Sequence, residues 1–212
     1  MILGIDFSIK SAAAALKSGD IYTFYSFARK GVIKEDAKNV FAAAGVLIFE
    51  TDEVTAPEKK ASISERERAS MLDALLLIPT IAKCFVDLPI AFWGIEGFSF
   101  ASTGNRLAQI SGYQWALRWE LIKGGLSVDS FQVYSPMTVK AIAGKGNFKK
   151  EEMIDAFIKS DDTFLQSTGL YKTLNSNPSL FQTKKGDWLK PLDDVVDSYW
   201  VLKTVEAHTT KV

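Results

Sequence analysis

Cysteine and histidine are almost absent from this sequence. Cys84 is the one cysteine, so no disulfide can form within the chain, which suits a reducing cytosol. His208 is the one histidine and stands close to the end of the sequence. Metal sites built on imidazoles, and catalysis by a Ser-His or Cys-His pair, are therefore nearly excluded. An enzyme of this composition would have to work with its carboxylates.

Long apolar runs and an excess of one charge are missing as well. No apolar stretch approaches the roughly 20 residues that a membrane helix needs, and residues 1–7 lack the basic start of a signal peptide. We therefore expect a cytoplasmic protein with no membrane attachment. The 25 basic and 25 acidic side chains cancel to zero. This disfavours DNA binding only mildly, because phosphates need a local basic patch and not a global surplus.

Hydrophobic periodicity predicts strands and helices in alternation, within a single domain over residues 1–212. Their order implies an α/β fold whose five-stranded mixed sheet has three antiparallel strands, then parallel strands, with helices on its faces. Pro79 is expected to kink or break its helix. Residues 29–61, with an optional strand at 45–49, and residues 161–190 are interpreted as insertions. The expected strands cover 1–7, 12–17, 21–27, 90–95 and 128–134, and the expected helices cover 62–85, 104–123, 136–143, 149–160 and 191–207.

Four acidic residues stand beside strongly apolar segments. Asp6 and Glu96 end apolar strands, where an unpaired buried carboxylate would cost several kcal/mol. Asp194 and Asp197 are three residues apart, so they share one face at the start of the last helix. Each acid alone has a simpler interpretation. Asp6 and Glu96 can be solvated strand ends, and acids such as Asp193 stabilise the dipole of the helix that they begin.

Taken together, the four acids predict a metal site. Four carboxylates without a basic partner repel one another, and a divalent ion removes that repulsion. Oxygen ligands without histidine or cysteine favour Mg²⁺ or Mn²⁺. Two such ions about 4 Å apart suit in-line displacement at phosphorus, because one activates water and the other stabilises the leaving oxygen.

The ordered motifs resemble RuvC-type Holliday junction resolvases of the RNase H-like superfamily. Residues 2–6 (ILGID) resemble the opening strand of that family, and residues 95–96 (IE) its second acidic site. Residues 194–197 (DVVD) resemble its final acidic pair. Residues 134–150 are similar to the segment that carries two functional lysines, and Lys140 and Lys150 fall on those positions.

The resemblance implies an RNase H-like fold and a homodimer that binds four-way DNA junctions. It also implies incision that depends on two Mg²⁺ (or Mn²⁺) ions in each active site. Asp6, Glu96, Asp194 and Asp197 would be the metal ligands, and Lys140 and Lys150 would join them as catalytic residues. The sequence departs from the family at Phe7-Ser8, where Pro-Gly is usual, and in the length of 29–61 and 161–190. Such expansions resemble phage- or virus-encoded relatives, which widens the expected substrate to branched DNA and places the protein in a host cytoplasm.

Several residues are candidates for DNA contact. The lysines around a glycine-rich loop can hold phosphates, although a solvated basic helix start explains them too. An aromatic residue lies near the DNA bases in the resembled family, and Phe98 or Phe100 can take that place. Trp115 and Trp119, four residues apart, are expected in the core or at a dimer interface. The candidates are Lys140, Lys145, Lys149, Lys150, Phe98, Phe100 and Arg106, with Lys184, Lys185 and Lys190 as a weaker second group.

Three other functions remain open at this point. An RNA-processing nuclease of the YqgF type would share the fold. An actin-like sugar kinase or ATPase half-domain would share its opening strands, but it needs glycine-rich phosphate loops that this sequence lacks. A non-catalytic nucleic-acid-binding domain would gain nothing from four neighbouring acids, which without metal would only destabilise it.

Overall fold

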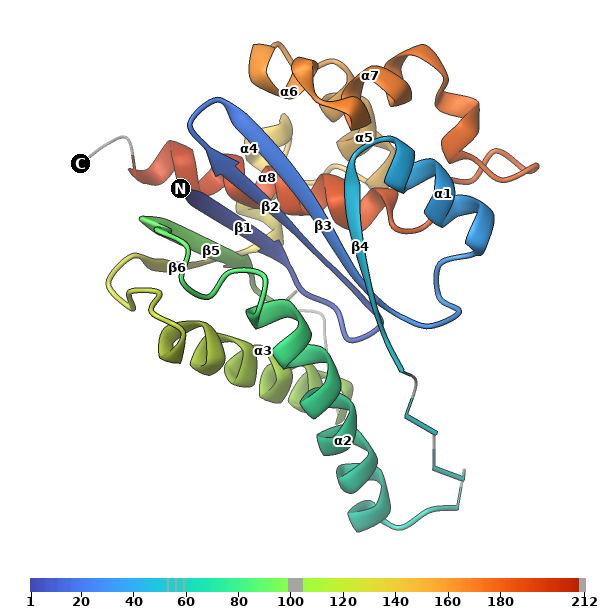
Figure 1. Ribbon diagram of the computed structural model, residues 1–212, viewed down its shortest axis with the longest axis vertical. Helices are drawn as coiled ribbons and strands as arrows, with labels where there is room; N and C mark the ends of the chain where they lie inside the picture. The colour runs from blue at the N-terminus through green and yellow to red at the C-terminus, as the bar shows by residue number, and fades with distance from the viewer. Residues whose placement is uncertain (53, 56, 59, 99–104, 210–212) are drawn as a thin grey trace.

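The computed structural model describes residues 1–52, 54–55, 57–58, 60–98 and 105–209, without the side chains of residues 105 and 106. A mixed six-stranded sheet in the order β4-β3-β2-β1-β5-β6 forms its centre (Figure 1). β1, β2 and β3 are antiparallel neighbours, whereas β5 runs parallel to β1 and to β6, and β4 runs parallel to β3. The strands are β1 (Ile2–Asp6), β2 (Ser11–Ser18), β3 (Ile21–Arg29), β4 (Val46–Thr51), β5 (Phe92–Glu96) and β6 (Phe131–Tyr134).

The predicted α/β class is confirmed, with three antiparallel strands followed by parallel strands in one mixed sheet. The predicted strand number of five is wrong, because the optional strand at 45–49 forms β4 on the edge of the sheet. Residues 29–61 also contain an unpredicted helix, α1 (Glu35–Ala43). Its two buried side chains, Ala37 and Phe41, pack into the core. Two apolar positions are too few to show a helical period, so the sequence pattern did not predict this helix.

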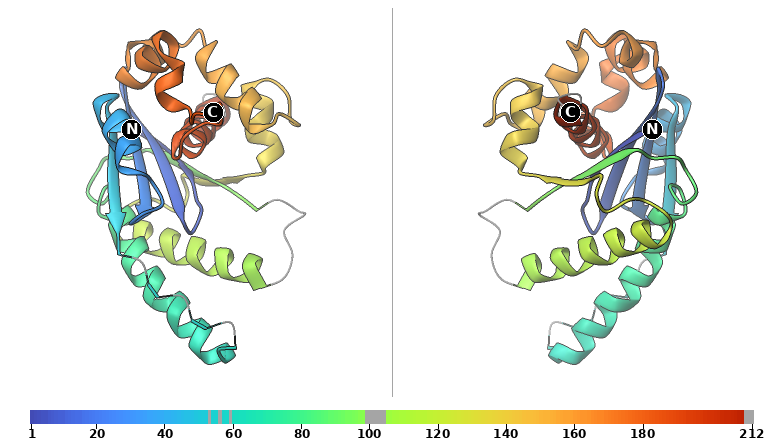
Figure 2. Two further views of the ribbon diagram at one scale, coloured as in Figure 1. Left: turned by 90° about the vertical axis from the view of Figure 1, so that its right-hand side faces the viewer. Right: turned by 90° about the vertical axis from the view of Figure 1, so that its left-hand side faces the viewer.

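Helices cover both faces of the sheet (Figure 2). α2 (Ile63–Ala82) and α3 (Asn105–Lys123) pack on one face, with a core around Trp93 and Phe85. α2 begins with a capping box of Ser62 and Glu65, and it continues through Pro79 to Ala82 instead of breaking. Among the described residues, we find no helix with the length and apolar character to cross a membrane. The opposite face carries α4 (Pro136–Ala143), α5 (Lys150–Ile158), α6 (Thr163–Ser167), α7 (Gly169–Ser176), η1 (Pro178–Phe181) and α8 (Leu192–Thr209).

Residues 161–190 are more ordered than their polar sequence predicts. α6, α7 and η1 each turn apolar side chains into the core, and Leu165, Leu170, Leu174 and Phe181 are fully buried. The following peptide bond, between Lys190 and Pro191, is cis and leads directly into α8. This insertion therefore packs beside the start of the last helix.

α8 lies in direct contact with β1 and β5 because both strands carry glycine where the helix crosses them. A Cβ on Gly4 would stand 2.3 Å from the backbone nitrogen of Leu202 and 2.7 Å from the carbonyl oxygen of Ser198. A Cβ on Gly94 would stand 2.6 Å from Cγ2 of Val205. The two glycines thus permit the close approach that brings the first turns of α8 to the ends of these strands.

Candidate metal centre

Three elements bring the four predicted acids together. Asp6 is the last residue of β1 and Glu96 the last residue of β5. The two strands are parallel neighbours with Ile5 opposite Ile95, so both carboxylates leave the same edge of the sheet. α8 contributes Asp194 and Asp197 from its first turns, and both are close enough to Asp6 for their charges to act on it.

Burial and mutual repulsion disfavour the charged forms of these acids. The pKa of Asp6 is raised well above its usual range by burial, and then by the charges of Glu96, Asp197 and Asp194. Burial raises the pKa of Glu96 to about 7, against the opposing effect of Lys140 and Lys150. Burial and the charge of Glu96 raise the pKa of Asp197 to about 7. At neutral pH this group of acids therefore favours a cation, or protons, between its members.

Asp194 is held by two donors from different parts of the chain. It is 5% exposed. The hydroxyl of Ser11, at the start of β2, donates a hydrogen bond of 2.6 Å to its Oδ2, and Nζ of Lys190 donates one of 2.8 Å to its Oδ1. Burial and the charge of Asp193 still raise its pKa, against the opposing effect of Lys190 and Ser11. The contacts leave this carboxylate oriented and incompletely neutralised.

Asp193 does more than stabilise the helix dipole. It forms ion pairs with Lys150, the first residue of α5, and with Lys190 at 2.7 Å. Burial alone would raise its pKa, but these two lysines outweigh burial and lower it. The charges of Lys150 and of Lys140, in the last turn of α4, both act on Glu96. Asp193 therefore anchors one of the two predicted lysines beside the acids.

The donor set suits a hard divalent cation. Its ligand atoms are all carboxylate oxygens, the type that Mg²⁺ and Mn²⁺ prefer. In the part of the chain that the structure describes, no hydrogen bond or ion pair reaches the carboxylates of Asp6, Glu96 and Asp197. In that same part, no three acidic, histidine or cysteine side chains are already gathered closely enough to hold an ion. The residues present fit the predicted metal by the chemistry of their ligand atoms.

The remaining predicted contacts differ in their surroundings. Lys145 and Lys149 are exposed on either side of the turn at Gly146, and Phe98, two residues after Glu96, is partly exposed. Phe100 and the side chain of Arg106 lie outside the described residues. Trp115 and Trp119 are 68% and 65% exposed, so they lie outside the core, and the dimer interface that was the alternative stays a prediction.

Residues that carry no sequence motif also support the acids. Besides Ser11, Lys190 and Asp193, the side chain of Gln114 is 2% exposed and donates a hydrogen bond of 3.0 Å to the carbonyl oxygen of Glu96. This contact ties α3 to the end of β5. Lys190 precedes Asp193 by three residues and Asp194 by four. This helical spacing was the one signal in the sequence for any of these contacts.

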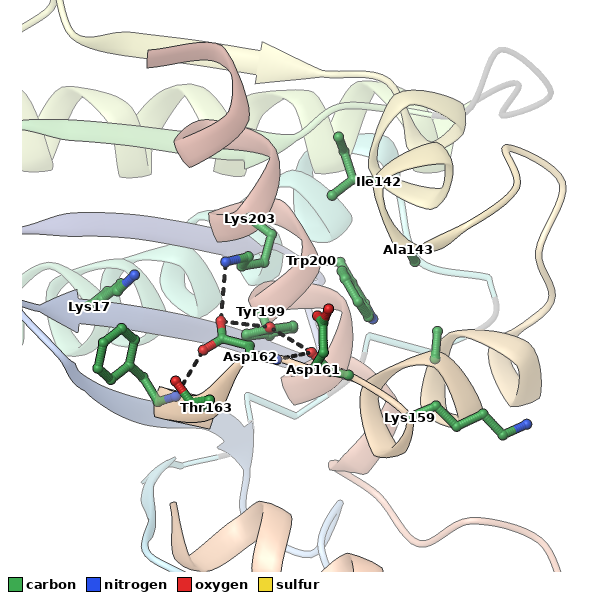
Figure 3. A pocket seen from close by; sticks show the side chains of 13 residues that line it. Lys17, Ile142, Ala143, Lys159, Asp161, Asp162, Thr163, Tyr199, Trp200 and Lys203 are labelled. Carbon is green, nitrogen blue, oxygen red and sulfur yellow. Dashed lines mark hydrogen bonds and ion pairs between the residues drawn. The ribbon is translucent and has the colours of Figure 1, made fainter. Parts of the chain in front are cut away.

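A separate hollow of about 780 Å³ lies further along α8 (Figure 3). Its charged groups are engaged in structural contacts: Asp162 accepts hydrogen bonds from Tyr22 at 2.7 Å and from Lys203 at 3.1 Å. Burial opposes the charge of Asp162, but these bonds and a backbone N–H lower its pKa to about 2. Lys17 and Lys203 both pair with Glu206. This network fastens the start of α6 to the sheet and α8.

Comparison with known proteins finds similarity in solved structures only. No protein-family model matches the sequence, and no curated protein matches it. Two structures of Thermus thermophilus RuvC, one of them in complex with Holliday junction substrate, align over 99% of this chain and 96% of theirs. They are 14% identical to this chain, with TM-scores of 0.49 and 0.48. So distant a likeness assigns no activity to this chain. Any activity has to be inferred from the side chains of the site itself.

Proposed function

We propose that this chain is a divalent-metal-dependent endonuclease that hydrolyses phosphodiester bonds in four-way junctions and other branched DNA. The observation that carries the proposal is that β1, β5 and α8 bring four carboxylates close enough for the charges of three of them to act on Asp6, and that their charged forms are disfavoured until a cation joins them. Phosphoryl transfer is the chemistry that all-oxygen sites of this kind serve best.

Each residue of the site has a proposed role. Asp6, Glu96, Asp194 and Asp197 hold the metal, and two bound Mg²⁺ or Mn²⁺ ions would supply an activated water and stabilise the leaving oxygen. Lys150, anchored by Asp193, and Lys140 offset negative charge at the reacting phosphate. Ser11 and Gln114 keep Asp194 and the end of β5 in place.

The proposed DNA path continues from this site over residues that the sequence singled out. Lys145 and Lys149 would hold backbone phosphates at the turn between α4 and α5. Phe98 and Phe100 would lie near the bases at the branch, and Arg106 would meet a phosphate at the start of α3. All three follow Glu96 closely in the sequence.

We also propose that the chain works as a homodimer, which would offer two active sites to a four-way junction. The supporting observation is that α2 and α3 expose large apolar side chains, since Met71, Leu75, Trp115 and Trp119 are each at least 65% exposed. Soluble monomers seldom leave so many large apolar side chains in water. Light scattering on the wild type and on Leu75→Glu tests this: a dimer that the charge dissociates supports it, and a monomeric wild type contradicts it.

Cleavage of defined substrates tests the activity. The protein would be incubated with Mg²⁺ and a synthetic four-way junction, beside Y-shaped, linear duplex and RNA substrates, with Asp6→Ala as the inactive variant. Paired nicks near the crossover, absent with the variant, are expected. Equal cutting of Y-shaped DNA would widen the substrate to branches in general. Cutting of RNA alone, or binding without any cutting in Mg²⁺ or Mn²⁺, would contradict the proposal.

A further inference from the structure

A β-hairpin beside the acids carries lysines that the proposed chemistry does not use. Residues 182–189 form this hairpin, which projects at the right of Figure 1 between η1 and α8. Its strands are joined by an antiparallel bridge between Gln182 and Trp188, and the N–H of Leu189 donates to the carbonyl of Phe181 at 2.7 Å. The hairpin therefore has a paired base on the same insertion that packs against the core.

The tip of the hairpin is also held by hydrogen bonds. The N–H of Thr183 donates to the carbonyl of Asp187 at 2.7 Å, and the Thr183 hydroxyl accepts from the N–H groups of Lys185 and Asp187 at 3.2 Å each. Gly186 supplies the positive φ of 87° that the reversal needs. This turn presents Lys184 and Lys185 to solvent, and among the described residues neither ammonium group has a partner.

A hollow of about 360 Å³ lies between the hairpin and the residues that pair with Asp193. Its walls come from the start of α5, from the hairpin and from the start of α8, and three of the lining residues are Lys150, Lys185 and Lys190. Asp193, on its floor, pairs with two of those lysines. Lys150, whose charge acts on Glu96, thus shares this hollow with Lys185 at the tip of the hairpin. Glu151 and Asp187 are also among the lining residues.

We propose that the hairpin of residues 182–189 is a clamp for the backbone phosphates of the DNA strand that flanks the cut. This inference rests on the proposed function for the identity of the polyanion. A row of lysines with no partner at its outer end suits successive phosphates along one strand better than a single small anion. Trp188, which lines the hollow and packs against the core, gives the clamp a rigid wall.

The salt dependence of DNA binding tests the clamp without requiring cleavage. Binding of a labelled four-way junction would be followed by fluorescence anisotropy in Ca²⁺ at several NaCl concentrations. Each lost phosphate contact reduces the magnitude of the negative slope of log K against log salt by about 0.9. Lys184→Gln with Lys185→Gln should therefore reduce that magnitude by up to about two units. The paired arginine variant should keep the wild-type slope. Lys83→Gln, at the exposed C-terminal end of α2, is the matched control and should change nothing.

The outcomes separate the clamp from the activity. A reduced slope in the glutamine variant, with an unchanged melting temperature, supports the clamp even if the wild type cuts no substrate. An unchanged slope in a protein that does cut junctions overturns the clamp and leaves the activity standing. A wild type that binds no DNA overturns both proposals.

Discussion

Ser11 and Asp194 meet across 183 positions of sequence through a hydrogen bond of 2.6 Å from the serine hydroxyl to Oδ2 of the carboxylate. The two residues are 3% and 5% exposed. Because a buried charge depends on each of its donors, this contact fastens the start of β2 to the first turn of α8 and orients a proposed metal ligand.

Ser11→Ala should destabilise the protein, because it removes a donor from a buried carboxylate. The expected loss is about 1–3 kcal/mol in the free energy of unfolding, measured by urea denaturation. Ser18→Ala, at the other end of the same strand, is the control and should stay within about 0.5 kcal/mol of wild type. Equal effects of the two substitutions would show that the contact contributes nothing.

Asp193→Asn should slow cutting by about ten-fold without abolishing it. The substitution weakens both ion pairs of Asp193, so Lys150 is no longer held where its charge acts on Glu96. Single-turnover rates at saturating junction would report the loss in the chemical step. Glu151→Gln is the control, because Glu151 is exposed and directly follows Lys150 in the sequence, and it should keep the wild-type rate. A fall in DNA affinity with an unchanged rate would contradict this positioning role.

The metal-free protein should become more stable as the pH falls from 8 to 5. Glu96 and Asp197 have a folded pKa of about 7, against roughly 4 in an unfolded chain. The folded state therefore binds more protons across that window, and its stability is lost as the pH rises through 7. Urea unfolding in a chelator at several pH values measures the slope, which Asp197→Asn should reduce. Stability that rises with pH would contradict the burial of these acids.

Gly4→Ala should destabilise the fold by about 1–3 kcal/mol or more, because the added methyl would meet the backbone of α8. The helix carries Asp194 and Asp197, so metal affinity should fall with stability. Gly112→Ala in α3 is a useful contrast, since its methyl would meet nothing within 4 Å. Thermal unfolding compares the two, and equal melting temperatures would mean that α8 does not depend on this close approach.

The sequence predicts the acids better than it predicts their supports. Asp6 and Glu96 end apolar runs, and Asp194 and Asp197 open an apolar helix, so local pattern and spacing are enough to select them. The contacts of Ser11 and Gln114 join residues far apart in the chain, and no local pattern encodes such pairs.

Local sequence patterns also fail to predict helices that bury only a few apolar side chains. α1 buries only Ala37 and Phe41, and the short helices of residues 161–190 place their few leucines among polar residues. Trp115 and Trp119 were expected in the core or at a dimer interface, and the structure excludes the core because both side chains are exposed. A periodic apolar face predicts that something covers it, but not whether the cover is the same chain or another copy.

Binding of Mn²⁺ to the protein without DNA tests the central claim, which is that the four carboxylates form a divalent-metal site. Titration calorimetry would compare the wild type with Asp6→Asn and Asp197→Asn, and with Asp155→Asn, an exposed acid on α5, as the control. We expect binding by the wild type and the control, and at least a ten-fold loss of affinity in the two site variants. Equal binding by all four proteins, or none by the wild type, would contradict the site.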